Sequence, residues 1–560
     1  MRAPNAYVLT IASSETETQE AQMSVTITTA AALAAPLALW LPAALPSDLA
    51  NRFGRRLVPL ANSLAWSAFA LAVVALLTHG FGPEESLTLL SIDLPLDIGA
   101  FAIGVYVNAV TVIMLTLVSL VGAIVSTYAR NYVAGDANEG RFHKWLLMTL
   151  AAILTLIVAG NLLMFALAWI ATSLCLHRLL LFYPERPAAL IAAHKKFVFS
   201  RIGDASLLIA VILIGATLHT LNWAGVGAAM ESIQGPLPAT LQWAAWLIVL
   251  SAALKCAQFP FHGWLIQVME APTPVSALLH AGIVNAGAFL VIRMSPIMSV
   301  SGPALTALAV IGLVTLTVAS LVMLTQTSIK VSLAWSTSAQ MGFMLLEAGL
   351  GLYSLALLHL VAHSLYKAHA FLAAGSSVDA FRAPALQFDA AGPQPWQWLV
   401  AFQGAVLMAL VAGFLFGVDP TRQPALIVTG VIVAIAVAQL LLQALVLQDK
   451  GVLLVRASAI GALVCLGYFG LHTAFESAIA GSVRPVPLPG RALDTALSLA
   501  IVAVFIGLIL LQHLFMRLAA PLRQAIQVHL YNGLYVDVVV TRLITRLWPL
   551  RRTPALVRGG

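Results

Sequence analysis

The sequence predicts an all-α, polytopic membrane protein with about 15 transmembrane helices. Of its 560 residues, 61% are hydrophobic and only 9% are charged, and the mean hydropathy is +0.95. A soluble domain is about one-quarter charged, so too few charges are present here to build a water-exposed surface. The lipid bilayer must therefore surround most of the chain.

The predicted helices follow apolar runs, because a membrane span needs roughly 20 apolar residues. The runs lie at 25–46, 57–79, 101–128, 143–160, 162–183, 195–217, 238–258, 274–296, 302–325, 329–349, 352–375, 397–418, 424–447, 453–473 and 494–518. Most are apolar on all sides, which excludes amphipathic surface helices for them.

Basic residues gather in alternate loops. The loops after the first, third, fifth and thirteenth runs are rich in Arg and Lys, whereas loops 80–100 and 218–237 contain none. This positive-inside pattern predicts an outward N-terminus and a cytoplasmic C-terminus. It also explains the net charge of +7 better than nucleic-acid binding does.

Three segments outside the runs have their own character. Residues 1–24 are polar and lack a signal-peptide pattern, so we expect a disordered tail, with Met23 an alternative start. The stretch 84–100 alternates too briefly to span a membrane, and we expect an exposed hairpin. The tail 519–560 carries several arginines among apolar residues, which suits a membrane surface or a cytoplasmic partner.

Lysines inside apolar runs are the first candidate functional residues. Lys255 and Lys367 lie deep in such runs, and Lys330 lies at the start of one. A charge at mid-membrane costs roughly 2.5–3.5 kcal/mol on insertion scales, so it usually marks a function. A desolvated amine can give and take a proton near neutrality. The alternative is a lysine that snorkels to the interface.

The segment after Lys255 predicts a broken helix. Pro260 follows five residues later and interrupts helical hydrogen bonding, and Glu270, Pro272 and Pro274 come soon after. Broken helices often form ion sites in transporters. A helix that simply ends at Pro260 is the other interpretation.

Histidines accompany these lysines. His359 and His363 are four residues apart, on one helical face that Lys367 continues, and His262 and His280 flank the proline-rich loop. Imidazole titrates near neutrality and can relay protons through water. Packed neutral histidines and a zinc site are the alternatives. Arg201 and Asp204 are spaced to form an ion pair, and the scattered Cys175, Cys256 and Cys465 support neither a disulfide framework nor an Fe–S cluster.

Several long motifs resemble a known family. They are RFHKWLLMT (141–149), KKFVFSRIGD (195–204), KCAQFPFHGW (255–264), MEAPTPVSALLHAG (269–282), TQTSIKVSLAWSTSAQMGFM (325–344) and HLVAHSLYKAHAFLAAGS (359–376). They resemble the proton-translocating antiporter-like subunits of respiratory complex I and of Mrp-type cation antiporters. The resemblance implies a core within 101–380, two inverted five-helix repeats, and broken seventh and twelfth helices. It places Lys255, Lys367, His262, His280, His359 and His363 on the proton path.

The chain departs from that family at two functional positions. A glutamate that follows the tryptophan of the fifth helix in the family is replaced by Ile170, after Trp169. The ionisable residue of the second broken helix has no counterpart in 397–418, where Gln403 is the polar candidate. The long lateral helix of the large complex I subunit is also missing.

These departures, the length and the ending HLYNGLYVDVVVTRLITRLWP (529–549) resemble the DabB family, the membrane subunits of DAB inorganic-carbon pumps. The resemblance implies a bacterial inner-membrane transport subunit, not itself an enzyme, in which proton or sodium flow drives a DabA-like cytoplasmic zinc protein related to β-carbonic anhydrases. We therefore expect no cofactor in this chain. The docking surface is expected to include His529, Tyr531, Asn532, Tyr535 and Asp537.

Two other functions remain open from the sequence. The chain can be a subunit of a complex I or Mrp-type antiporter, although Ile170 counts against this. It can also be a membrane anchor that no longer conducts and only recruits an enzyme. The lost ionisable groups favour the anchor, and the retained Lys255 and Lys367 count against it.

Overall fold

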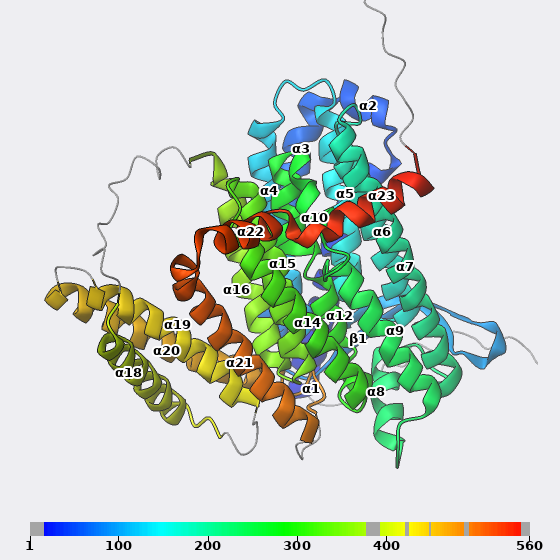
Figure 1. Ribbon diagram of the computed structural model, residues 1–560. Coiled ribbons are helices and arrows are strands. Elements are labelled where there is room, and N and C mark those ends of the chain that lie inside the picture. Colours follow the sequence, from blue (N-terminus) through cyan, green and yellow to red (C-terminus); the bar gives the residue numbers. More distant parts are fainter. Residues whose placement is uncertain (1–15, 377–392, 420–424, 447–449, 487–491, 550–560) are drawn as a thin grey trace, which may run out of the picture.

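The computed structural model describes residues 16–376, 393–419, 425–446, 450–486 and 492–549 (Figure 1). The first part contains α1 (Thr16–Trp40), α2 (Ser47–Arg52), α3 (Gly54–His79), β1 (Glu85–Asp93), β2 (Ala100–Val107), α4 (Ala109–Tyr132), α5 (Glu139–Val158), α6 (Leu162–Leu180), α7 (Pro187–Leu218) and α8 (Trp223–Ser232). Next come α9 (Ala239–Lys255), α10 (Gly263–Gln267), α11 (Thr273–Leu278), α12 (Ala286–Arg293), α13 (Ser295–Met298), α14 (Gly302–Met323), α15 (Ile329–Gly349) and α16 (Tyr353–Leu372). The chain continues with α18 (Pro395–Leu415), α19 (Ala425–Val446), α20 (Lys450–Ile479), α21 (Ala492–Leu514), α22 (Ala520–Tyr531) and α23 (Val536–Leu547).

The all-α polytopic membrane fold is confirmed, and the exact number of spans stays a prediction. Within the described ranges, eleven helices are long and apolar enough to cross a membrane, and Ile27–Trp40 and Ala239–Lys255 are shorter apolar helices. The predicted runs 329–349 and 352–375 also form helices, α15 and α16. Their glutamate, histidines and lysines lower the mean hydropathy of α15 and α16, so these two helices are not among the eleven.

The predicted hairpin exists, but its second strand begins only at Ala100 and extends beyond 84–100 to Val107. β1 pairs antiparallel with β2, with Glu85 opposite Val107 and Asp93 opposite Ala100. The span predicted to start at residue 101 therefore begins only at Ala109. The side chain of Asn108 caps α4 by accepting a hydrogen bond from the Thr111 amide at 3.0 Å. The apolar residues of β2 hid this boundary.

The helix after residue 238 is broken, as predicted. α9 ends at Lys255, five residues before Pro260, and the chain resumes helical structure in the short α10. After Pro272 the next helix contains a π-helical segment, Leu279–Ile283, between α11 and α12. Such π segments are rare and are frequently found at functional sites.

The second broken helix that the resemblance implies does not appear at 397–418. α18 runs without interruption from Pro395 to Leu415, and Gln403 is exposed. α18, α19 and α20 form their own hydrophobic cluster beside the main bundle (Figure 1). With no proline inside this part of the sequence, nothing interrupts helical hydrogen bonding there.

Both ends of the chain differ from simple tails. Residues 16–24, expected to be disordered, belong to α1, and residues 1–15 lie outside the described ranges. At the other end, α22 and α23 cross the outside of the bundle rather than extending from it (Figure 1). They lie towards the same end of the bundle as α2 and the loop between α4 and α5, where basic residues are numerous.

Candidate functional site

Two groups of buried polar side chains lie within the main bundle. We call the first the α7 cluster; it consists of Trp169 and Ser173 on α6, Lys196, Arg201 and Asp204 on α7, and Lys255 at the end of α9. We call the second the α16 cluster; it consists of His280, Ser336, Gln340, Glu347, His359, His363 and Lys367. Each group contains one of the two predicted lysines.

Lys255 lies where α9 breaks off, inside the α7 cluster. Its Nζ is 4.2 Å from the centre of the Trp169 ring, which is a cation–π contact. Asp204 is the carboxylate that interacts electrostatically with Lys255. The predicted ion pair of Asp204 with Arg201 is present. The negative charge near Lys255 therefore comes from α7, since Ile170 on α6 supplies none.

Lys196 completes the α7 cluster. Its Nζ donates hydrogen bonds to the backbone oxygen and to the Oγ of Ser173, the latter at 2.9 Å. Arg201 donates to the same Oγ at 3.2 Å. Three cations and one carboxylate are thus gathered in the α7 cluster.

The α16 cluster brings titratable side chains of α15 and α16 close together. His359 bonds Glu347 Oε2 through Nδ1 at 2.9 Å and Gln340 Oε1 through Nε2 at 2.7 Å. The His359 and His363 rings are 6.2 Å apart, and His363 interacts electrostatically with His280 and Lys367. The predicted juxtaposition of these histidines is therefore present, and α16 carries two of them on one face.

Lys367 lies one turn beyond His363 and is fully buried. Its Nζ donates to the Leu333 backbone oxygen at 3.0 Å and to Ser336 Oγ at 2.9 Å. Both acceptors are neutral, so among the described residues no hydrogen-bonded carboxylate fixes its charge. A lysine held in this way can exchange its proton with a neighbouring group.

Two of the predicted histidines have ring nitrogens without a protein partner in the described ranges. His280 stacks on Phe371 with 4.4 Å between ring centres, and His262 lies 4.7 Å from the Trp335 ring. Neither nitrogen of either ring is hydrogen-bonded. Buried polar groups of this kind are usually satisfied by water, so both positions suit a hydrated path.

Other predicted residues lie away from these clusters. Lys330 donates to Thr273 Oγ1 at 3.0 Å at the start of α15. Glu270 is half exposed and lies 4.0 Å from Arg186 at the surface. Pro272 precedes α11 and Pro274 occupies its first turn, so these prolines set the start of that helix.

Sequence reasoning missed several buried cations, among them Lys195, Lys196 and Arg293. Lys195 is fully buried and pairs with Asp537, and Arg293 donates hydrogen bonds to Asn108 Oδ1 at 3.1 Å and Thr111 Oγ1 at 2.9 Å. Arg293 also lies over the Tyr106 ring at 4.5 Å. It ties α12 to the β-hairpin and to α4. An arginine inside the apolar run 274–296 was the available signal.

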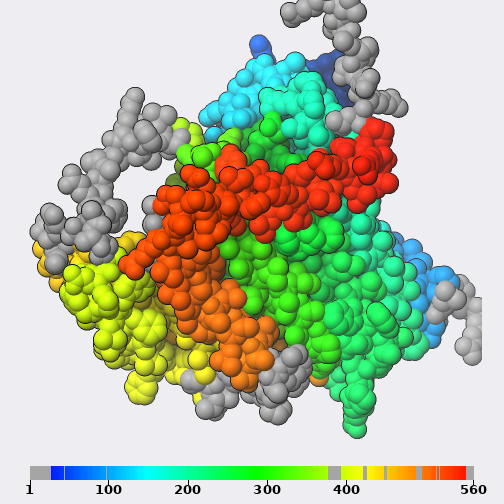
Figure 2. Space-filling model, viewed as in Figure 1, coloured from blue at the N-terminus to red at the C-terminus, as the bar shows by residue number. Residues whose placement is uncertain are grey.

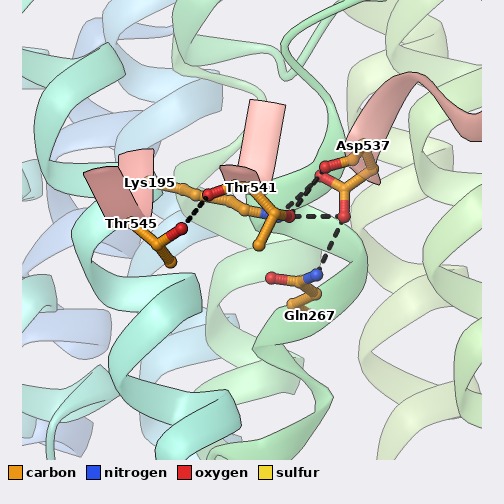
Figure 3. Close-up of polar contacts among 5 residues, drawn as sticks. All are labelled: Lys195, Gln267, Asp537, Thr541 and Thr545. Atoms are coloured by element: carbon orange, nitrogen blue, oxygen red, sulfur yellow. Dashed lines mark hydrogen bonds and ion pairs between the residues drawn. The ribbon is translucent and has the colours of Figure 1, made fainter. Parts of the chain in front are cut away.

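The predicted docking residues differ in their exposure. His529, Tyr531, Asn532 and Tyr535 are exposed on α22 and the turn that follows it. Asp537 instead points into the bundle, where it accepts hydrogen bonds from Lys195 and Gln267 (Figure 3). Four of the five thus remain open to a partner.

Two family models match the chain. Residues 159–390 match the membrane domain described as "NADH:quinone oxidoreductase/Mrp antiporter, TM", and residues 96–143 match "NADH-Ubiquinone oxidoreductase (complex I), chain 5 N-terminus". The first match contains every residue of both clusters. The antiporter-like resemblance is thereby confirmed.

Curated relatives cover nearly the whole chain. The probable inorganic carbon transporter subunit DabB2 of Halothiobacillus neapolitanus is 43% identical over 92% of this chain and 94% of its own length. The probable subunit DabB of Hydrogenovibrio crunogenus is 40% identical over 80% of this chain and 83% of its own length.

Solved structures share the fold. A chain of the Mrp complex from Dietzia is 21% identical with a TM-score of 0.57, and the match covers 96% of this chain and 61% of that chain. A chain of an archaeal membrane-bound sulfane sulfur reductase is 18% identical with a TM-score of 0.53. The match covers 93% of this chain and 99% of that chain. Together with the apolar helices, these findings establish a multi-pass membrane subunit of the cation-transport class. The chain belongs to the DabB family of inorganic carbon transporter subunits, within the antiporter-like group of complex I and Mrp membrane proteins.

Proposed function

We propose that this chain is the membrane subunit of an energy-coupled inorganic carbon uptake pump. A proton or sodium gradient drives ions through the subunit, and this flow drives a cytoplasmic carbonic-anhydrase-like partner that converts CO2 to bicarbonate. The observation that carries the proposal is the presence of two buried ionisable clusters, around Lys255 and Lys367, in a chain 43% identical to a DabB2 subunit.

The clusters have the parts that an ion path needs. Each has a lysine that can hold or lose a proton, and His280, His359 and His363 lie in the α16 cluster with Lys367. Buried ionisable residues are costly in a membrane, so they are retained where they serve transport. This argues against the alternative of a membrane anchor that does not conduct.

The zinc chemistry belongs to the partner in this proposal, and this chain holds no cofactor. The partner is a DabA-like zinc protein in the cytoplasm. It meets the basic end of the bundle, which the positive-inside rule assigns to the cytoplasmic side of the inner membrane. The exposed His529, Tyr531, Asn532 and Tyr535 supply part of its docking surface.

Affinity purification of the tagged chain in mild detergent, followed by zinc analysis, tests the partner. We expect a large zinc-containing protein to co-purify in a fixed ratio with the chain. Flavin or Fe–S subunits, or a set of small antiporter subunits, would contradict the proposal and would assign the chain to a respiratory or Mrp complex. A chain that purifies alone under conditions that preserve other membrane complexes would also contradict it.

A further inference from the structure

The C-terminal helices form a strap across the bundle. We call residues 520–547, which comprise α22, a short turn and α23, the strap. Figure 2 shows it crossing one face of the bundle, where α23 contacts α7 and α22 contacts α14. It is held at several points: the Gln326 side chain donates to the Tyr531 backbone oxygen at 3.2 Å, and Trp548, just beyond α23, stacks on His194 with 4.0 Å between ring centres.

Asp537 is the residue of the strap that reaches into the bundle. Its two carboxylate oxygens accept hydrogen bonds from Lys195 Nζ at 2.7 and 2.9 Å, and Gln267 Nε2 donates to it at 2.8 Å (Figure 3). The Lys195 side chain is 0% exposed and the Asp537 side chain is 26% exposed. Asp537 therefore supplies the counter-charge to a cation that water does not reach.

The partners of Asp537 belong to the elements that form the ion path. Lys195 is the neighbour in α7 of Lys196, which lies in the α7 cluster and bonds Ser173. Gln267 ends α10, the short helix that follows the break after Lys255. Asp537 also interacts electrostatically with His262, the residue just before α10. One carboxylate thus joins α7 to the downstream side of the broken segment.

Gly263 makes this approach possible. A Cβ built at Gly263 would lie 1.5 Å from Asp537 Oδ1, so any side chain there would displace the carboxylate. The absence of a side chain at Gly263, the first residue of α10, therefore leaves the space that the Asp537 carboxylate occupies. An exposed strap that served only to cover the bundle would not need a glycine at this position.

We infer that Asp537 is a positioning residue of the ion path: by holding Lys195 and the start of α10, it links the strap to the α7 cluster and the broken helix. A partner docked on the strap can then affect ion flow through the position of one carboxylate. This inference rests on the proposed function, because it assumes that ion flow drives carbon uptake. It concerns a residue of the strap that faces away from any docked partner.

The test uses Asp537→Asn in the full chain, expressed together with its zinc-protein partner. Three quantities are measured: folded chain by size exclusion in detergent, co-purified zinc protein, and uptake of labelled inorganic carbon with and without an ionophore. We expect zinc protein per folded chain to stay within twofold of the unchanged complex, while gradient-dependent uptake per folded chain falls at least tenfold. Gly263→Ala, which alters no ionisable group, is expected to lower uptake in the same way. Asp537→Glu is expected to restore part of the uptake.

Thr545→Ala is the matched control, because the Thr545 hydroxyl donates only to backbone oxygens of its own helix.

Unchanged uptake in Asp537→Asn would overturn the inference. If that variant does not fold, the exchanged pair Lys195→Asp with Asp537→Lys decides. A folded exchanged pair without uptake supports a positioning role, because the carboxylate has moved away from the strap. Full recovery of both folding and uptake would show a simple tie between two helices and would contradict the inference. Uptake by the unchanged complex that ignores the ionophore would instead contradict the proposed function itself, whatever Asp537→Asn does.

Discussion

At the scale of single residues, Lys255 is the residue on which the proposed ion path most depends. It lies at the end of α9 over the Trp169 ring, with Asp204 as its carboxylate partner. Lys255→Ala is expected to abolish carbon-dependent growth while leaving folded protein in the membrane, because the relay is lost and the side chain removed is not one of the apolar residues of the core. Growth in air of a strain without its own carbonic anhydrase measures this. Arg130 is exposed, so Arg130→Ala is the control, and a strain that carries it should grow normally. Normal growth of Lys255→Ala would rule out this path.

Asp204 is expected to take the role of the family's glutamate, which Ile170 replaces in this chain. Removing one member of a buried ion pair typically costs about 3–5 kcal/mol, and the Asp204 side chain is 6% exposed. Asp204→Asn should therefore lower both the amount of folded chain and the uptake of inorganic carbon. A second change, Ile170→Glu, places a carboxylate next to Trp169 and should restore part of the uptake in the double variant. If Ile170→Glu restores nothing although the double variant folds, the carboxylate is needed at position 204 itself.

At the scale of elements, the close packing of α14 against α15 leads to a prediction about stability. α14 and α15 approach closely through glycines: a Cβ at Gly342 would lie 2.6 Å from the Gly312 backbone oxygen, and one at Gly312 would lie 2.4 Å from that of Gly342. Small residues at such contacts let membrane helices pack backbone to backbone. Gly342→Leu should therefore separate the two helices and destabilise the bundle by about 1–3 kcal/mol or more.

The thermal stability of the purified chain in detergent measures this effect. Gly467 on α20 has nothing within 4 Å of the position of its Cβ, so Gly467→Leu is the matched control and should leave the melting temperature unchanged. Equal melting temperatures for both variants would show that the close contact of α14 and α15 does not limit stability.

The sequence predicts the helical membrane fold and the main ionisable residues because both depend on local composition. Runs of apolar residues fix helices, and lysines or histidines within them are conspicuous, as Lys255, Lys367 and His363 show. Pairings between distant segments are not visible in this way. Asp537 and Lys195 are 342 positions apart, and nothing in their local sequences joins them. The limits of β2 were also hidden, since an apolar strand and the start of an apolar helix have the same composition.

At the scale of the whole molecule, the central claim is that ion flow through the two clusters drives carbon uptake. The most direct measurement is the uptake of labelled inorganic carbon by cells that express this chain and its zinc-protein partner, before and after collapse of the proton gradient and, separately, of the sodium gradient. The account predicts that collapsing one of these gradients abolishes uptake, and that Lys255→Ala cells take up no more than cells without the complex. Uptake that persists when both gradients are collapsed, or that Lys255→Ala leaves intact, would contradict it.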